Sequence, residues 1–323
     1  MPLVSVVIPT YKHANFVLET LDSVFAQTFT DFEVIVVNDG SPDNTAAVLR
    51  PIIASGKIRY IEQPNRGQAA ARNRGILEAN GEYIALLDDD DLWAPDKLQW
   101  QVDALRQRPD CVLVYGQLRT FGGGLRYTTP EAGAKAGTTR EHFIGRVWIN
   151  SPGQALIRAA ALRKIGGFDS NIWGTDDWDL YLNLSECGPF LYVPRVALNY
   201  RYHAANASKD VRRLWQNARH VAEKHFGHSG RRPDAADLHK SRLFVKKFIS
   251  EDCFNHANFY ATEGDMHRAW QLVKLAMRVD PRGNLKQTAK WWLQHRHPNR
   301  GRTMREHFSL LRRRLSARPP SAG

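Results

Sequence analysis

Features that would assign this chain to several common classes are rare or missing. It has three cysteines among 323 residues, too few and too widely spaced for a disulfide framework or a zinc site, which fits a reducing compartment. No uninterrupted apolar run approaches the roughly 18–20 residues that cross a bilayer. Residues 1–4 lead into a strand-like segment without the basic region and cleavage site of a secretory signal. We therefore expect a cytoplasmic protein.

Two glycine-rich nucleotide-binding patterns are also absent. No G-x-G-x-x-G follows the first predicted strand, and G-x-x-x-x-G-K-[ST] occurs nowhere in the chain. Their absence argues against a dinucleotide-dependent enzyme and against a P-loop NTPase.

Charge is distributed unevenly along the chain. The formal net charge is +12, and from Ala205 onward there are 25 Lys and Arg against 10 Asp and Glu. The residues before Ala205 have a slight excess of acidic groups. A hydrophobic content of 43% and a charged content of 24% are those of a soluble globular protein. The change in charge predicts two domains, 1–208 and 209–323, with different surfaces.

Apolar, β-branched segments alternate with helical patterns through the first domain. This alternation predicts an α/β fold with a doubly wound, mostly parallel sheet. The predicted strands are 4–8, 33–37, 58–61, 84–87, 112–116 and 190–193, and the predicted helices include 14–26, 67–79 and 178–184.

Four consecutive carboxylates, Asp88 to Asp91, follow the apolar segment 84–87 directly. Carboxylates at the C-terminal end of a buried strand lie where open α/β sheets bind their ligands. Four adjacent negative charges repel one another, so a divalent cation shared with substrate phosphates, Mg²⁺ or Mn²⁺, is a natural explanation. Alternatively, Asp91 and Asp96 cap the helix that follows. Polar residues also end the first two strands, at 10–11 and 38–40, and the three loops should meet at one edge of the sheet.

Several of these segments together resemble glycosyltransferase family 2 of the GT-A fold. The matching motifs, which also keep the family's order and spacing, are VVIPTY at 6–11, VNDGS at 37–41, NRG at 65–67 with ARN at 71–73, LDDDD at 87–91, GGFD at 166–169 and DDWDL at 176–180. The resemblance covers residues 2–208, with a donor half at about 1–115 and an acceptor half at about 116–208. It implies sugar transfer from a nucleotide-diphosphate donor with inversion at the anomeric carbon.

The resemblance also implies residue roles on the donor side. Asp39 would contact the base or ribose, and Arg72 would lie near the base or diphosphate. Asp88 and Asp90 match the family's D-x-D, the first contacting ribose or metal and the second binding metal, while Asp89 stands where the family usually has Ser. The remaining expected donor and metal contacts are Pro9, Thr10, Tyr11 and His203.

Asp177 matches the family's general base. The acceptor hydroxyl needs a carboxylate to take its proton, and the adjacent Asp176 can raise the pKa of that carboxylate by like-charge repulsion. Alternatively, both residues simply begin the helix 178–184.

The acceptor side is expected in the second half of the first domain. The glycine-rich segments 122–124 and 130–139 predict either an acceptor-site loop or a plain surface loop. A single Trp could stack on a sugar or pack in the core. The expected acceptor-side residues are Trp148, Asn150, Ser151, Trp173, Asp176 and Trp178.

From 209 onward the pattern is helical and basic. Residues 262–281 resemble half of a tetratricopeptide unit, and one partial unit cannot form a solenoid, so we expect a helical pair packed on the catalytic domain. A tail rich in Trp and Arg follows, which suits either docking on an anionic membrane surface or a solvated basic face. No nucleic-acid recognition motif accompanies the charge.

The sequence thus predicts a metal-dependent inverting glycosyltransferase with a C-terminal helical appendage. The donor would be a UDP-sugar, with dTDP- and GDP-sugars as alternatives, and the acceptor a glycan or lipid-linked glycan. Two alternatives remain open: a non-catalytic nucleotide-sugar-binding or scaffold protein, and a metal-dependent nucleotidyltransferase.

Overall fold

The computed structural model describes residues 1–122, 128, 140–144, 147–203, 210–228, 230 and 234–295. The chain divides into two compact units, one of Met1–Ser208 with Gln216–Ser241, and one of Lys209–Trp215 with Arg242–Gly323. The segments 130–139 and 296–323, for which sequence patterns suggested an acceptor loop and a membrane-docking tail, lie outside the described residues.

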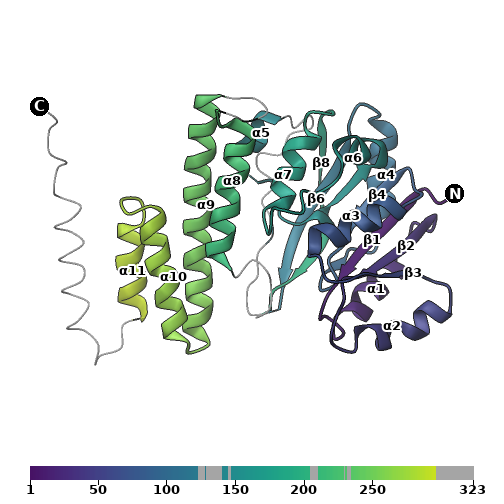
Figure 1. The fold of residues 1–323 in the computed structure, drawn as a ribbon, viewed down its shortest axis with the longest axis horizontal. Helices are drawn as coiled ribbons and strands as arrows, with labels where there is room; N and C mark the ends of the chain where they lie inside the picture. The colour runs from purple at the N-terminus through teal and green to yellow at the C-terminus, as the bar shows by residue number, and fades with distance from the viewer. Residues whose placement is uncertain are drawn as a thin grey trace, which may run out of the picture. The chain divides into compact units, whose positions relative to one another are not determined.

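The first unit is built on an eight-stranded sheet with the order β3-β2-β1-β4-β7-β6-β8-β5 (Figure 1). The strands β3, β2, β1 and β4 are parallel to one another, β6 is parallel to β8, and the pairs β4–β7, β6–β7 and β5–β8 are antiparallel. The strands are β1 (Val4–Thr10), β2 (Phe32–Asn38), β3 (Arg59–Glu62), β4 (Tyr83–Leu86), β5 (Leu92–Trp93), β6 (Leu113–Phe121), β7 (Ala155–Arg158) and β8 (Phe190–Arg201).

Helices cover both faces of this sheet, because each central strand is apolar on both sides. The helices of the sheet-containing unit up to β8 are α1 (Val17–Phe25), α2 (Thr45–Ala54), α3 (Gln68–Glu78), α4 (Lys97–Gln107), α5 (Arg140–Ile144), α6 (Ala159–Ile165) and α7 (Asp176–Leu184), with a 3₁₀ turn at Pro152–Gln154. The α/β fold with a mixed, mostly parallel sheet confirms the prediction.

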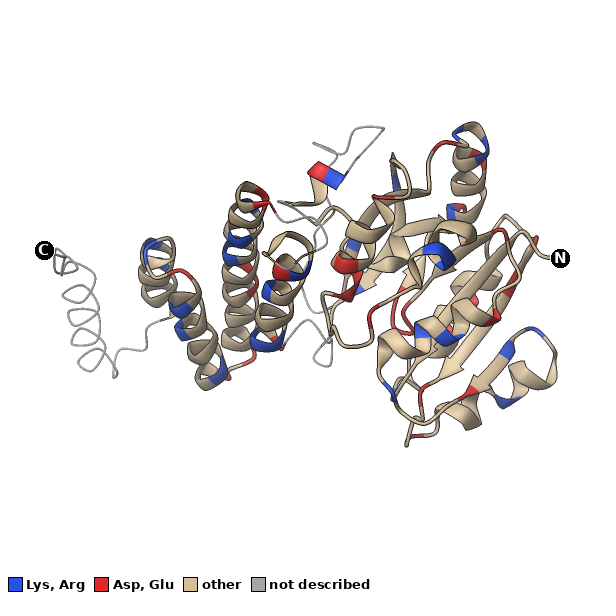
Figure 2. Ribbon diagram, turned by 45° about the horizontal axis from the view of Figure 1, so that its top comes forward, with Lys and Arg blue, Asp and Glu red and all other residues tan. Residues whose placement is uncertain are grey.

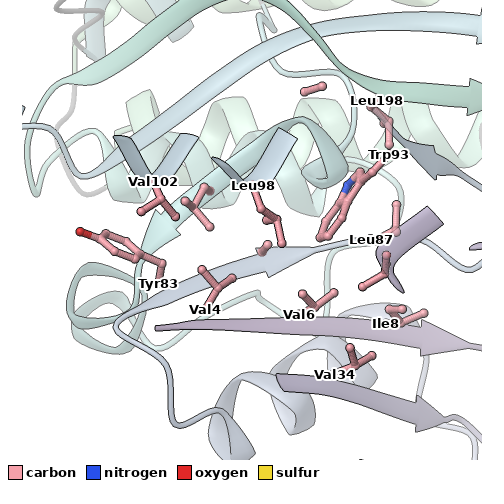
Figure 3. Close-up of a cluster of buried hydrophobic side chains, with 14 of the residues drawn as sticks. Val4, Val6, Ile8, Val34, Tyr83, Leu87, Trp93, Leu98, Val102 and Leu198 are labelled. Atoms are coloured by element: carbon pink, nitrogen blue, oxygen red, sulfur yellow. The ribbon is translucent and has the colours of Figure 1, made fainter. Parts of the chain in front are cut away.

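Strand β1 shows how alternation divides its side chains between the two layers. Val4, Val6 and Ile8 join one buried cluster with side chains of α1 and α4 (Figure 3). Val7 points to the opposite face, where α3 lies close: a Cβ placed on Gly75 would come within 2.2 Å of Val7 Cγ1. Glycine at position 75 therefore lets α3 approach the sheet more closely than any other residue would allow.

Several predicted boundaries in the first unit differ from the structure, most of all at β6 and β8, which continue to Phe121 and Arg201 rather than ending at 116 and 193. Strand β1 continues through Pro9 to Thr10 rather than ending at Ile8. Its pairing with β4 ends at Val7, so beyond that residue β1 has a ladder partner only in β2, and a residue without an N–H is tolerated there. The first helix begins at Val17 rather than Ala14, because residues 13–16 form a separate turn.

The C-terminal region is helical, as predicted. It consists of α8 (Val211–Phe226), α9 (Ala235–Thr262), α10 (Met266–Val279) and α11 (Leu285–His295). Gly264, at φ +82°, turns the chain between α9 and α10, and the Asp265 side chain caps α10 by accepting from Arg268 N at 3.0 Å. Trp291, in the segment for which membrane docking was one of two alternatives, is 4% exposed and stacks on Trp270. Among the described residues, no helix is both long and apolar enough to cross a membrane.

Candidate active site

The ends of β1, β2 and β4 meet at one edge of the sheet, as the sequence suggested. Thr10 is paired with Asn38, and Asp39 N donates to Thr10 O at 2.9 Å. On the other side of β1, Leu87 N donates to Val7 O at 3.0 Å, which brings the carboxylates 88–91 beside the end of β1.

Each of the four consecutive carboxylates has a different partner. Asp88 Oδ1 accepts from Arg72 Nη2 at 2.6 Å, and Asp89 Oδ1 lies 2.7 Å from His13 Nδ1. Asp90 Oδ2 lies 2.9 Å from His203 Nε2. The fully buried Asp91 accepts from Arg201 N at 2.9 Å. The protein's own groups therefore offset much of the repulsion, and the charge of the cluster does not by itself require a cation.

The surroundings change the ionisation of this cluster. Burial raises the pKa of Asp89, against the opposing effect of His13, and burial with the neighbouring carboxylates raises the pKa of Asp91 well above its ordinary value. Burial opposes protonation of His13, but the hydrogen bond to Asp89 and the adjacent negative charges raise its pKa to about 9. At this pKa His13 carries a proton at neutral pH, which it would release on binding a metal ion.

Three side chains at this edge could hold a metal ion together. One ligand atom each from His13, Asp90 and His203 lie within 4.8 Å of one another. A carboxylate with two imidazoles suits Mn²⁺ better than Mg²⁺, which prefers oxygen ligands. The donor set therefore fits the expected metal. Asp88, also expected there, has one oxygen occupied by Arg72 and by Gln68 Nε2 at 3.0 Å.

Arg72 connects the carboxylate cluster to the start of α7. It is 3% exposed, and its Nη1 donates to Asp176 Oδ2 at 3.0 Å while Nη2 donates to Asp88. Its guanidinium also lies over the ring of Phe168, 5.1 Å from the centroid. The buried Arg72 side chain therefore contacts both the expected donor side, at Asp88, and the expected base side, at Asp176.

Asp177 follows Asp176 in the first turn of α7. Asp177 is half-buried, and its carboxylate accepts from Trp178 N at 2.7 Å. Burial and the neighbouring Asp176 raise the pKa of Asp177 to about 8, against the opposing effect of Arg72. Because the guanidinium bonds directly to Asp176 rather than Asp177, Asp177 can exchange a proton near neutral pH.

Asp39 organises the loop that leads into α3. Its two carboxylate oxygens accept from Gln63 Nε2, Arg66 N and Gly67 N at 2.7–2.9 Å. Of its expected neighbours, Thr10 is buried at 2% and Tyr11 is 37% exposed. Tyr11 N donates to Asp89 Oδ2 at 3.2 Å. Asp89 therefore supports the loop after β1, and the roles of Asp39 and Asp89 toward a donor stay predictions.

The expected acceptor-side residues have different environments. Trp178 is 1% exposed and its Nε1 donates to Phe143 O, so its ring packs in the core and offers no open face to a sugar. Ser151 is buried and caps the 3₁₀ turn, while Asn150 is exposed. Trp148 and Trp173 are half-buried. Core packing is thus the better account of Trp178, and the remaining assignments stay predictions.

Sequence reasoning missed His13 and Arg201. His13 lies just after β1, close in sequence to the predicted residues Thr10 and Tyr11. It is 76 residues away from Asp89 in the sequence, so the sequence pattern did not predict that the two side chains pair. Arg201 donates from N to Asp91 Oδ1 and from Nε to Asp90 O at 2.8 Å. Of the segment 200–203, only His203 was predicted to belong to the site.

Side chains of α8 contact α7 and the segment that precedes it. Lys224 Nζ lies 2.8 Å from Asp169 Oδ2 and 2.9 Å from Asp179 Oδ2, and the fully buried His225 Nε2 lies 2.8 Å from Asp179 Oδ1. Although burial opposes it, hydrogen bonds from His225 and Lys224 lower the pKa of Asp179. These ion pairs fix the helix that presents Asp177.

Comparison with known proteins agrees with this geometry. The family model described as glycosyl transferase family 2 matches residues 5–166, about half of the chain, and a model described as glycosyltransferase-like family 2 matches residues 133–228. The chain belongs to glycosyl transferase family 2.

This glycosyltransferase-family chain has relatives of moderate similarity. It is 32% identical over 215 residues to an uncharacterized glycosyltransferase of Rickettsia felis, covering 65% of this chain and 36% of the relative. It is 31% identical over 217 residues to chondroitin synthase of Escherichia coli, covering 64% of this chain and 30% of that protein. The chain spans about a third of the length of the first curated relatives it matches.

Solved structures share the fold at low sequence identity. TarS 1–349 of S. aureus, in complex with UDP-GlcNAc, matches with a TM-score of 0.61 and 17% identity over 86% of this chain and 83% of that one. The mannosyltransferase PcManGT from Pyrobaculum calidifontis, in complex with GDP-Man and Mn²⁺, matches with a TM-score of 0.59 and 20% identity over 96% and 84%. These neighbours confirm the GT-A fold.

Proposed function

We propose that this protein is a metal-dependent inverting glycosyltransferase. It would move a sugar from a nucleotide-diphosphate donor to a hydroxyl of a glycan or lipid-linked acceptor, with Asp177 as the general base. The observation that carries the proposal is the double contact of Arg72, which joins Asp88 of the carboxylate cluster to Asp176 beside the base. Family membership supports the same reaction class.

The chemistry assigns separate tasks to the two ends of this site. Asp177 accepts the proton of the acceptor hydroxyl as its oxygen attacks the anomeric carbon. The bond from that carbon to the diphosphate oxygen breaks on the opposite side, and configuration is inverted. Asp90, His203 and His13 would hold a metal ion, which supplies charge neutralisation for the leaving diphosphate. Arg72 keeps the base helix and the donor side in a fixed relation.

A UDP-sugar is the preferred donor, with GDP- and dTDP-sugars as alternatives. The fold neighbours carry both kinds, UDP-GlcNAc in TarS and GDP-Man in PcManGT, the second with Mn²⁺. Relatives named chondroitin synthase and hyaluronan synthase support a glycan acceptor. The excess of Lys and Arg after Ala205 supports peripheral contact with an anionic membrane surface on the cytoplasmic side.

Donor binding gives a direct test of the metal site. A thermal-shift screen of nucleotide sugars with Mn²⁺ should identify the donor, and calorimetry should then show that chelation, Asp90→Asn or His203→Gln weakens nucleotide-diphosphate binding at least about tenfold. Asp110→Asn is the matched control, because Asp110 is exposed and pairs with Arg108 outside the site. Unchanged affinity after chelation would contradict the metal-dependent mechanism.

Asp177→Asn separates catalysis from binding. The variant should bind donor and metal with near wild-type affinity and transfer sugar at least about 100-fold more slowly, the usual contribution of a general base. Full activity in this variant would remove Asp177 from the proposed role. Donor binding without any transfer or hydrolysis in the wild type would favour the non-catalytic alternative. Release of pyrophosphate from a nucleoside triphosphate would favour a nucleotidyltransferase.

A further inference from the structure

The C-terminal unit contains a groove outside the catalytic unit, with a volume of about 480 Å³. It is formed by the first residues of α8, by Tyr260 near the end of α9, and by one side of α10. Its lining is Asp210, Val211, Arg212, Tyr260, Arg268, Gln271, Leu272, Lys274, Leu275 and Arg278. This volume lies within the range of small-molecule sites.

The groove is strongly cationic. Four of its lining residues, Arg212, Arg268, Lys274 and Arg278, are basic, whereas Asp210 is the single acidic one. Helix α10 contains no Asp or Glu anywhere along its length. Helix α8 begins among the lining residues, where Asp210 Oδ1 accepts from Arg213 N at 3.1 Å, so the single acidic side chain caps this helix.

Most of these cations have no counter-charge. Within the ranges that the structure describes, Arg212, Lys274 and Arg278 form no ion pair. Arg268 reaches Asp265 through Nε at 3.3 Å, which leaves its two terminal nitrogens for another acceptor. Figure 2 marks the Lys and Arg positions of these helices in blue. Gathering positive charges costs free energy through mutual repulsion, and a bound anion would offset it.

We propose that this groove binds a phosphate-bearing ligand. Arginine forks pair with phosphate oxygens in a bidentate manner, and three of the four cations are arginines. Leu272 and Leu275 add apolar wall beside the charges, so the ligand carries a less polar part next to its phosphate. A lipid headgroup and a soluble phosphorylated molecule share this chemistry. The site is independent of the sugar-transfer reaction.

The test uses the full-length protein with two groove cations neutralised. The variant R268Q/R278Q keeps polar side chains and removes two positive charges from exposed positions on α10. R282Q is the matched control, since Arg282 is an exposed arginine of the same unit outside the groove. Inorganic pyrophosphate is titrated by calorimetry in the presence of a metal chelator, which suppresses metal-mediated binding at the catalytic edge. In parallel, flotation measures retention on vesicles of phosphatidylcholine with one quarter phosphatidylglycerol.

The expected result is a loss of at least about tenfold in pyrophosphate affinity for R268Q/R278Q, as for removal of charge-assisted hydrogen bonds, and no change for R282Q. If pyrophosphate also displaces the wild type from vesicles, and the groove variant floats less, the ligand is a lipid headgroup. If vesicle retention is the same in all three proteins, the ligand is a soluble phosphorylated molecule.

Equal pyrophosphate affinity in the three proteins would overturn the proposal, as would an equal loss in the groove variant and the control, which would indicate a non-specific basic surface. Absence of binding in the wild type would overturn it as well. Thermal melting verifies that the variants are folded, and R212Q/K274Q, which neutralises the other two cations, replaces the first variant if it does not fold.

Discussion

At the scale of single residues, two adjacent carboxylates, Asp176 and Asp177, differ in their contact with Arg72. Asp176 accepts a hydrogen bond from Arg72, whereas the Asp177 carboxylate accepts from the backbone amide of Trp178 and has a pKa of about 8. A carboxylate with such a pKa is a stronger base than an ordinary one, but it is ionised only in part at neutral pH. This difference leads to two predictions.

The first concerns the pH dependence of transfer. We expect kcat/KM to rise with pH, with an apparent midpoint near 8, because only ionised Asp177 accepts the proton. Asp176→Asn removes the neighbouring negative charge and should move the midpoint to lower pH. The measurement is the initial rate at low acceptor concentration between pH 5 and 9 in both proteins. A midpoint that does not move in the variant would contradict the proposed effect of Asp176 on the base.

The second concerns stability. Between the ordinary carboxyl pKa near 4 and about 8, the folded chain keeps a proton on Asp177 that the unfolded chain has released. Stability therefore falls as pH rises through this window. Asp177→Asn should raise the melting temperature at pH 8 by about 2–4 °C, and by less at pH 5. Asp110→Asn should produce no such gain, because the bond from Arg108 lowers the pKa of Asp110.

The sequence predicted which carboxylates gather at this edge, but not their partners. Strand ends on one side of a parallel sheet must meet, so Asp39 and residues 88–91 could be brought together from pattern alone. The partners His13, Arg72, Arg201 and His203 come from three distant segments. Which of the four adjacent aspartates each partner contacts depends on the conformation of the turn after β4. Hydrophobic periodicity in the sequence does not predict that conformation.

At the scale of elements, helix α7, which carries the proposed base Asp177, is held in place by residues of α8. The Lys224 ammonium lies between Asp169 and Asp179, and Asp179 is 1% exposed. Helix α8 was predicted as part of the basic C-terminal region, because its composition is basic. Its Lys224 nevertheless forms ion pairs within the first unit, to which residues 216–241 belong.

Removing that ammonium should loosen α7. Lys224→Met leaves two carboxylates near each other with one cation fewer, and we expect a loss of about 2–3 kcal/mol in the free energy of unfolding. Transfer activity should fall as well, while donor affinity stays near the wild-type value. Urea denaturation monitored by circular dichroism measures the loss. Lys164→Met, on the exposed side of α6, is the control and should change stability by less than about 0.5 kcal/mol.

At the scale of the whole molecule, composition located a boundary near 208, and the contact pattern divides the chain in a different way. Residues 209–215 belong to the second unit, but 216–241 belong to the first. Charge and helical periodicity could not reveal this division, since α8 is continuous in both.

Two truncations should therefore differ in stability. A fragment of residues 1–208 lacks Lys224 and His225, whereas a fragment of residues 1–241 keeps both and also Ser241, whose Oγ donates to Ile144 O at 2.9 Å. We expect the longer fragment to melt at least about 5 °C higher. Differential scanning fluorimetry checks this, and equal melting temperatures would contradict the assignment of 216–241 to the catalytic unit.

The close approach of α3 to the sheet has an evolutionary consequence for the molecule. Arg72 lies one helical turn before Gly75 on α3, so it belongs to the part of the helix that the missing methyl group at position 75 lets pack closely on the sheet. Alanine at 75 should therefore be tolerated better in descendants of this sequence once position 7 has become smaller. Gly75→Ala should cost about 1–3 kcal/mol through overpacking, Val7→Ala should recover part of it, and a double-mutant cycle on folding and transfer would reveal this historical order as a coupling energy.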